Sequence, residues 1–154
     1  PDRVAMATAL WSRAGDKLVL PTGAVIAQQL DAAATTREVA RDAIPPGWAM
    51  YDIDSNSARA FGEIIAASGT VLWNGPMGVF ETPPFDRGTL AVAQALAQAT
   101  RNGATTIVGG GDSAAAVAAA GLENQVTHVS TGGGASLEFL EGRPLPGVDA
   151  LDDA

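Results

Sequence analysis

The chain has 154 residues, of which 47% are hydrophobic and 17% charged, a composition that fits one globular domain with a real core. Nine Lys and Arg stand against seventeen Asp and Glu, and this acidic balance excludes a nucleic-acid partner, which would require a basic face. Cysteine is absent and no apolar run is long enough to cross a bilayer, so we exclude disulfides, thiolate metal sites and a membrane partner, and expect a cytoplasmic protein.

Short apolar runs alternate with Ala-rich stretches along the chain, and this alternation predicts strands and helices in turn. In chain order the predicted elements are a helix at 2–11, strand pieces at 17–20 and 24–27, a helix at 57–67, a strand at 70–74, a helix at 88–99, a strand at 104–108, a helix at 113–120, a strand at 126–130 and a short helix at 136–140.

Alternating strands and helices favour a parallel sheet with right-handed crossovers and helices on both faces. We therefore predict the α/β class, as a three-layer doubly wound parallel sheet of Rossmann-like type. Only three strong strand–loop–helix units are present, which is a thin sheet for this architecture. The sequence thus predicts a partial domain that lacks upstream strands.

Three of the predicted strands end in glycine-rich loops, at residues 74–81, 109–113 and 131–136. In open parallel sheets the carboxyl ends of the strands lie at one edge, and ligands bind there. Glycine exposes backbone N–H groups, and a helix that follows directly adds its unpaired N–H groups and partial positive charge. Lys17 is the single lysine, so a bound phosphate would depend on such backbone donors. Together the loops predict an anion-binding cradle.

Two other interpretations of the glycine runs are open. A glycine run after a strand is often only a tight turn. Gly109, Gly111 and Ala114 also match the G-x-G-x-x-A pattern of dinucleotide-binding folds. That pattern needs an acidic residue at the end of the next strand to hold a ribose, and the nearest acid, Glu123, comes before that strand. We therefore disfavour dinucleotide binding.

The carboxylates near the loops have alternative roles. Asp112 follows Gly111 directly, where Asp112 or Ser113 would cap a helix, or where Asp112 would coordinate Mg²⁺ beside bound phosphates. Glu81 closes the first loop, where it either binds both hydroxyls of a ribose or is a solvated loop acid. His128, the single histidine, lies inside a predicted strand, which favours a packing role over a catalytic one.

Longer motifs around these loops resemble those of one enzyme family. The motifs are VLWNGPMGVFE at 71–81, FDRGT at 85–89, GGGDSAA at 109–115, STGGGASLEFLEG at 130–142 and LPGV at 145–148. Their order and spacing resemble those of the phosphoglycerate kinases, from about residue 17 to the C-terminal end.

The resemblance implies a transferase, a kinase of glycolysis that moves a phosphoryl group between 1,3-bisphosphoglycerate and ADP, with Mg²⁺ as the cofactor of ATP or ADP. It implies that residues 1–154 are the C-terminal part of the nucleotide-binding domain. The N-terminal domain, which binds 3-phosphoglycerate or 1,3-bisphosphoglycerate, would be absent, so the fragment alone would be inactive. The full-length enzyme would be a monomer. The alternative is a non-catalytic nucleotide-binding module diverged from this family.

Carried over by position, the resemblance implies roles for residues of the loops. The nucleotide would be bound by Asn74, Glu81, Gly110, Gly111, Asp112 and Ser113. The transferring phosphoryl group would face the backbone amides of Gly132, Gly133 and Gly134, which is the catalytic contribution. Glu81 would bind the ribose and Asp112 would bind Mg²⁺.

The sequence departs from the family near the adenine site, where residues 47–55 read GWAMYDIDS. Met50 stands where the family has a glycine and Tyr51 where it has a leucine, while residues 21–24 read PTGA in place of PVDV. The upstream lysine that meets the nucleotide phosphates in the family has no counterpart, because Lys17 opens a predicted strand rather than closing one. These departures bear on adenine affinity and on the choice of base.

Overall fold

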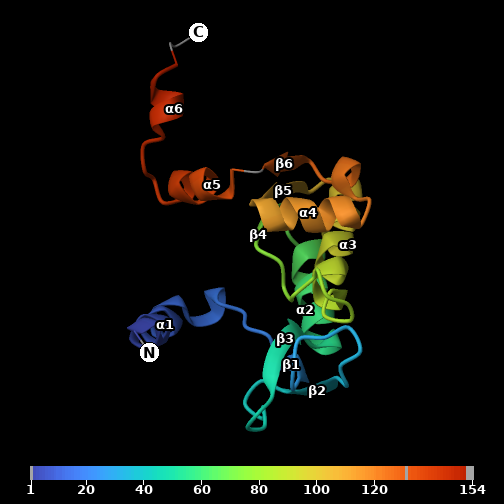
Figure 1. The fold of residues 1–154 in the computed structure, drawn as a ribbon. Coiled ribbons are helices and arrows are strands. Elements are labelled where there is room, and N and C mark those ends of the chain that lie inside the picture. The colour runs from blue at the N-terminus through green and yellow to red at the C-terminus, as the bar shows by residue number, and fades with distance from the viewer. Residues whose placement is uncertain (1, 131, 152–154) are drawn as a thin grey trace.

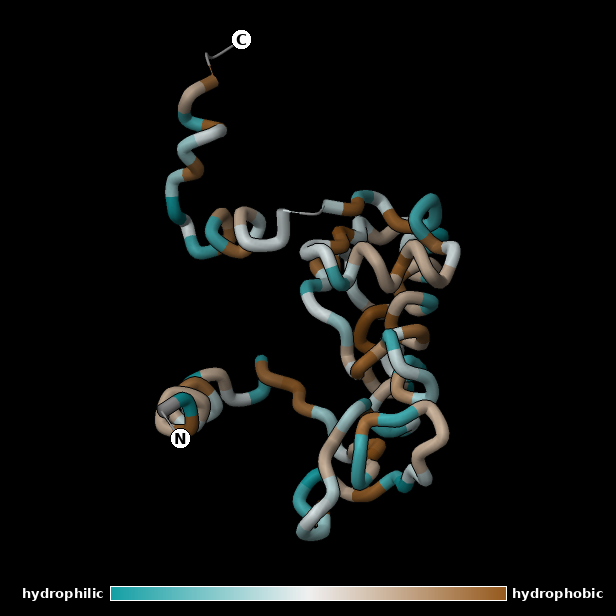
Figure 2. The backbone as a smooth tube through the Cα atoms, viewed as in Figure 1, coloured by the Kyte–Doolittle hydropathy of each residue, from teal (hydrophilic) through white to brown (hydrophobic). Residues whose placement is uncertain are grey.

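The computed structural model describes residues 2–130 and 132–151, which form two small sheets with helices around them (Figure 1). The N-terminal helix α1, Asp2–Ala14, confirms the helix predicted at 2–11 and lies to the left of both sheets in Figure 1 and Figure 2. Its apolar side chains Val4 and Trp11 are more than half exposed. The guanidinium of Arg41 lies over the ring of Trp11, 5.2 Å from the ring centroid. A 3-10 turn, Gly15–Lys17, follows the helix.

The strand predicted at 17–20 is wrong. Leu18 and Val19 are exposed and belong to neither sheet. They line a hollow beside Val71 and Leu72 without joining a hydrogen-bonded ladder. An apolar, β-leaning run becomes a strand only when a neighbour accepts its backbone hydrogen bonds.

Residues 23–53 form an antiparallel sheet of strand order β2-β1-β3. Its strands are β1 (Gly23–Ala27), β2 (Arg37–Ala40) and β3 (Ala49–Ile53). The strand predicted at 24–27 is confirmed as β1, but its neighbours are antiparallel, and the sequence pattern does not predict β2 and β3. The connection at 28–36 is shorter than the dozen or so residues of a parallel crossover, so the chain turns back on itself.

The second sheet is parallel, with strand order β4-β5-β6. Its strands are β4 (Thr70–Asn74), β5 (Thr105–Gly109) and β6 (His128–Ser130). The helices are α2 (Ser55–Ala66), α3 (Arg87–Arg101), α4 (Gly111–Ala119), α5 (Gly133–Leu140) and α6 (Pro146–Asp149), with a further 3-10 turn at Glu123–Gln125. Each parallel strand is followed by a helix, which confirms the α/β, partial Rossmann-like fold.

Helices α2 and α3 pack against each other and connect the two sheets. Asp54 caps α2, because its side chain accepts a hydrogen bond from the backbone N–H of Ser57 at 3.0 Å. At its other end α2 contributes Ile65 to the core of the parallel sheet. Within the described residues, no helix combines the length and apolarity that a membrane span requires.

The core lies on one face of the parallel sheet. Trp73 of β4 and Val108 of β5 are buried there against Leu96 of α3 and Val117 of α4. Each buried side chain of this size contributes about 1.5–3 kcal/mol relative to an exposed one. This face fixes the register of the strands, and with it the position of the loops that follow them.

The opposite face of the parallel sheet is more open. Leu72 and Ile107 are only half-buried and line a groove of about 440 Å³ together with Phe139 of α5. His128 pairs with Ile107 in the ladder and is exposed. The packing role predicted for His128 is therefore wrong, because β6 is an edge strand and the described elements leave this part of its surface uncovered.

Candidate functional site

The second glycine loop turns directly from β5 into α4. Gly110 has φ 96° and ψ 147°, a conformation that essentially only glycine adopts. Its N–H donates to the carbonyl of Ser130 at 3.0 Å, which ties the loop to the end of β6. The helix begins at Gly111 rather than at the predicted residue 113, so Gly110 occupies the N-cap position.

The third glycine loop meets the second through the backbone. A Cβ added to Gly133 would lie 2.6 Å from Cα of Gly110, which leaves no room for a side chain. Helix α5 begins at Gly133 rather than at residue 136, with Gly132 as its N-cap, and a Cβ on Gly134 would meet open space. Thr131 lies outside the described residues. The N-termini of α4 and α5 therefore lie side by side, each with unpaired N–H groups and a partial positive charge.

The first glycine loop joins the other two through Asn74 and Gly75. The side-chain amide of Asn74 donates to the carbonyl of Gly133 at 3.4 Å. The N–H of Gly75 donates to Oγ of Ser113 at 2.7 Å, and Ser113 is fully buried. The Ser113 hydroxyl therefore holds the first loop instead of capping α4. We call residues 74–75, 109–113 and 132–134 the glycine-loop edge.

Asp112 occupies the first turn of α4 and is exposed. It follows the N-cap residue rather than occupying that position, so the capping role considered for it is wrong. Among the described residues, no three His, Asp or Glu side chains gather closely enough to hold a metal ion alone. A single exposed carboxylate beside an anion cradle fits Mg²⁺, which is often bound by one or two carboxylates together with phosphate oxygens and water.

Glu81 is exposed in the long connection between β4 and α3. The connection is anchored to α3 on the N-terminal side of Glu81, because Oγ1 of Thr89 accepts hydrogen bonds from the N–H groups of Met77 and Gly78 at 3.0 and 3.2 Å. Phe80, next to Glu81, packs against the core of the parallel sheet. The backbone that carries Glu81 is thus fixed, while its carboxylate stays in contact with solvent.

Met50 and Tyr51, the two departures from the family pattern, both lie in β3 of the antiparallel sheet. Met50 is 41% exposed. The ring of Tyr51 packs against Phe85 with 5.0 Å between the ring centroids, and its carbonyl accepts a hydrogen bond from Val79 in the first loop. Tyr51 therefore has a structural use, as a support of the connection that carries Glu81.

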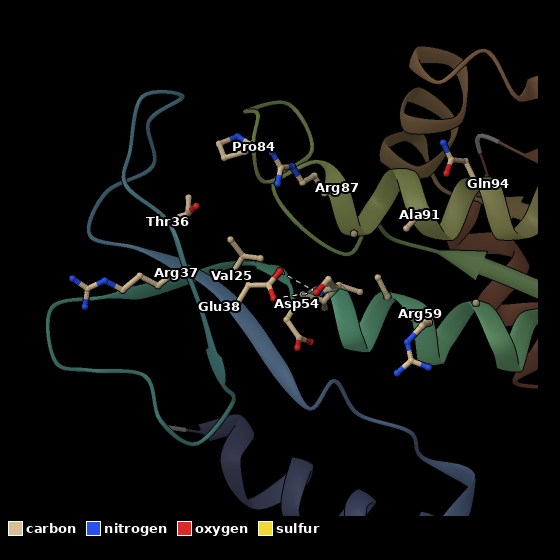
Figure 3. Close-up of a pocket in the computed structure, with 15 residues that line it drawn as sticks. Val25, Thr36, Arg37, Glu38, Asp54, Arg59, Pro84, Arg87, Ala91 and Gln94 are labelled. Carbon is tan, nitrogen blue, oxygen red and sulfur yellow. Dashed lines mark hydrogen bonds between the residues drawn. The ribbon is translucent and has the colours of Figure 1, made fainter.

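A hollow of about 600 Å³ lies elsewhere, between the antiparallel sheet and helices α2 and α3 (Figure 3). Both of its carboxylates are already engaged. Glu38 accepts hydrogen bonds from the N–H and hydroxyl of Ser55, and Asp54 caps α2. Arg37 stacks on Trp48, and Figure 3 shows it extending away from Glu38 and Asp54. The volume of a hollow alone does not identify a site, and convergent backbone donors make the glycine-loop edge our candidate.

Two residues near the site are not predicted by the sequence pattern. Thr89 lies in α3 and anchors the first loop, and Asp52 is buried at the end of β3, beside Gly88 of α3. Both act on backbone groups far from them in sequence. A single sequence does not indicate contacts between residues so far apart. Its one hint is that the carboxylate of Asp52 stands next to apolar Ile53.

Comparison with known proteins agrees with the motifs. The phosphoglycerate kinase family model matches residues 1–143. The chain is 53% identical to a phosphoglycerate kinase of Chloroherpeton thalassium over 99% of its own length and 39% of that relative. It is 52% identical to the cytosolic phosphoglycerate kinase of Triticum aestivum, over 99% of its own length and 39% of that relative.

A solved structure gives the same result. The phosphoglycerate kinase of Coxiella burnetii matches with a TM-score of 0.88 and 39% identity, covering 96% of this chain and 38% of that one. The chain therefore spans about two fifths of the length of the relatives it matches. Over residues 1–143, in sequence and in fold, the chain belongs to the phosphoglycerate kinase family.

Proposed function

We propose that residues 1–154 are the C-terminal part of the nucleotide-binding domain of a phosphoglycerate kinase, and that they bind Mg-ADP or Mg-ATP at the glycine-loop edge. The observation that carries this proposal is the contact of Gly133 with Gly110, which places two helix N-termini together. Two such termini stabilise the adjacent negative charges of a polyphosphate better than one.

The proposed division of roles follows the three loops. The amides of Gly110 and Gly111 bind the nucleotide phosphates at the start of α4. Ser113 is buried and acts through Gly75, so its part is to hold the first loop in place. Asn74 bridges to the third loop, and Glu81 binds the ribose hydroxyls.

Asp112 is the proposed ligand of Mg²⁺. When bound, the metal would neutralise charge on the phosphate oxygens. The chain's own contribution to phosphoryl transfer is made by the amides of Gly132, Gly133 and Gly134, at the start of α5. They are fixed in position and aimed at oxygens that carry charge in the transition state, so they need no reorganisation during the reaction.

The complete reaction is part of the same proposal: phosphoryl transfer between 1,3-bisphosphoglycerate and ADP, in the cytoplasm, by a full-length monomer with a separate domain for the phosphoglycerate. We expect the 154-residue chain alone to bind nucleotide without turning it over. The alternative, a diverged module that binds nucleotide but serves no catalysis, rests on the changed residues Met50 and Tyr51.

Calorimetric titration of the chain with ADP, with and without Mg²⁺, tests the binding proposal. Saturable binding that strengthens with Mg²⁺ is the expected result, and its absence in a folded chain would contradict the proposal. Fusing the chain to the upstream three fifths of a close relative separates the two functions. Phosphoryl transfer by the fusion favours the kinase, whereas nucleotide binding without transfer favours the non-catalytic module.

A further inference from the structure

Asp52 is a buried carboxylate for which the proposed function has no use. Its side chain is 0% exposed at the end of β3. Oδ2 accepts a hydrogen bond from the N–H of Gly88, at the start of α3, at 2.7 Å. Oδ1 accepts from the N–H of Ile53 at 2.8 Å. A carboxylate is rarely removed from water without a specific reason.

The surrounding backbone is shaped to hold this carboxylate. A Cβ added to Gly88, or to Gly78 in the first glycine-rich connection, would clash with Oδ1 of Asp52. Neither position can carry a side chain while Asp52 is in place. Asp52 therefore links β3, to which it belongs, with two segments that are distant in sequence: the connection from β4 and the first turn of α3. We call Asp52, Gly78 and Gly88 the Asp52 clasp.

The contacts around the clasp all act on the connection between β4 and α3. The N–H of Val79 donates to the carbonyl of Tyr51 at 2.9 Å. Thr89, next to Gly88, accepts hydrogen bonds from Met77 and Gly78. The connection is thus held by β3 on one side and by α3 on the other, and the bond from Gly88 to Asp52 joins these two supports.

We propose that Asp52 is a positioning residue for nucleotide binding. Its carboxylate locks β3 to α3 and so sets the place of the connection that carries Glu81, which in turn meets the ribose. This inference rests on the proposed function. Asp52 itself touches no nucleotide, and the α4 and α5 termini, which bind the phosphates, are supported by other contacts. Loss of Asp52 should therefore weaken recognition of the nucleoside and spare recognition of the phosphates.

Asp52→Asn in the 154-residue chain tests this division. Asn keeps the size of the side chain but offers one acceptor and one donor, so the N–H of Gly88 or of Ile53 loses its partner. The matched control is Asp54→Asn, two residues along, where Asn caps α2 as well as Asp does. Two probes are titrated by calorimetry in the presence of Mg²⁺: ADP and inorganic pyrophosphate. Circular dichroism verifies that each variant is folded.

The expected result is a loss of about tenfold in ADP affinity for Asp52→Asn, with pyrophosphate affinity unchanged and Asp54→Asn close to the unaltered chain. Unchanged ADP affinity, or equal losses for both probes, would overturn the inference. If the unaltered chain binds neither probe, the proposed function fails and this inference fails with it. Should Asp52→Asn not fold, Thr89→Val replaces it, because it removes the acceptor of Met77 and Gly78. A selective loss for ADP then supports the positioning role, and equal losses overturn it.

Discussion

The glycine-loop edge and the hollow beside the antiparallel sheet are built in opposite ways. The hollow has a volume of about 600 Å³, but its carboxylates are bonded to nearby backbone or hydroxyl groups, and Arg37 and Arg59 have partners of their own. The glycine-loop edge has few side chains, and its first-turn amides at α4 and α5 are the groups left to meet a ligand. The proposed polyphosphate site therefore rests on convergent backbone donors and not on the volume of a hollow.

The largest expected effect comes from closing the contact between the two helix N-termini. In Gly133→Ala the new methyl group would meet the backbone of Gly110 at 2.6 Å, so the loops must separate. We expect Mg-ADP affinity to fall about 100-fold, because small displacements of a preorganised site have effects of this size. The control is Gly62→Ala in α2, where the methyl group would make an ordinary 3.8 Å contact. Equal nucleotide affinities in the two folded variants would argue against the glycine-loop edge as the site.

A smaller effect is expected at the one carboxylate of the glycine-loop edge. Asp112→Asn should lower ADP affinity about tenfold when Mg²⁺ is present and hardly at all when it is absent. Stability should change little, because Gly110 and not Asp112 holds the N-cap position of α4. Calorimetric titration with and without Mg²⁺ makes the measurement. If ADP affinity depends on Mg²⁺ equally in the unaltered chain and in Asp112→Asn, Asp112 is not a ligand of the metal.

Asp52 lies between the two regions. Its titration should change the free energy of unfolding rather than the glycine-loop edge. Burial, the largest influence, raises its pKa, as does nearby Asp86, against the opposing hydrogen bonds from Gly88 and Ile53. The stability that this group contributes is therefore fully present below its ordinary pKa of 3.8 and is lost as pH rises through the folded-state pKa. Urea unfolding at a series of pH values should show the advantage of the unaltered chain over Asp52→Asn shrinking from acid toward neutral pH. An advantage that grows with pH would be the contrary result.

The smallest effect is expected in the hollow itself. The side chains of Arg59 and Glu63 form an ion pair while 67% and 66% exposed. Such pairs contribute about 0.3–0.5 kcal/mol, so Arg59→Ala should lower the free energy of unfolding by no more than that. Mg-ADP affinity should not change. A marked loss of nucleotide affinity in this variant would move the site toward the hollow and reverse the comparison.

Sequence reasoning succeeds where local pattern and fold agree. The strand at 70–74 is predicted with its observed bounds, and the alternation of strands with helices gives the parallel sheet and the edge at which its loops meet. Helices α4 and α5 begin earlier than predicted. Glycine is a poor helix former, so the glycines of each first turn do not indicate a helix in the sequence. The starts at Gly111 and Gly133 matter for the proposed function, since they place the unpaired amides in the loops themselves.

The antiparallel sheet is where sequence reasoning fails. β2 reads REVA and is mostly exposed, so it has no apolar periodicity to detect. β3 contains Asp52, one residue before its end, and the burial of Asp52 depends on Gly78 and Gly88, far along the chain. Contacts of this kind are set by tertiary packing, which overrides local propensity. The support of the first loop by Thr89 escapes prediction for the same reason.

The hydrogen bond from Asn74 to Gly133 joins residues that are 59 positions apart. The backbone N–H groups of the glycine-loop edge come from segments that are far apart in the chain, so the unfolded chain does not bring them together. A polyphosphate therefore has no comparable site to bind before the sheet forms. Ligand and fold are then coupled by mass action: at a concentration 100 times its Kd, a ligand that recognises only the native state adds about 2.7 kcal/mol to the free energy of unfolding. The melting temperature of this chain should therefore report on the occupancy of the glycine-loop edge, even where no reaction can be followed.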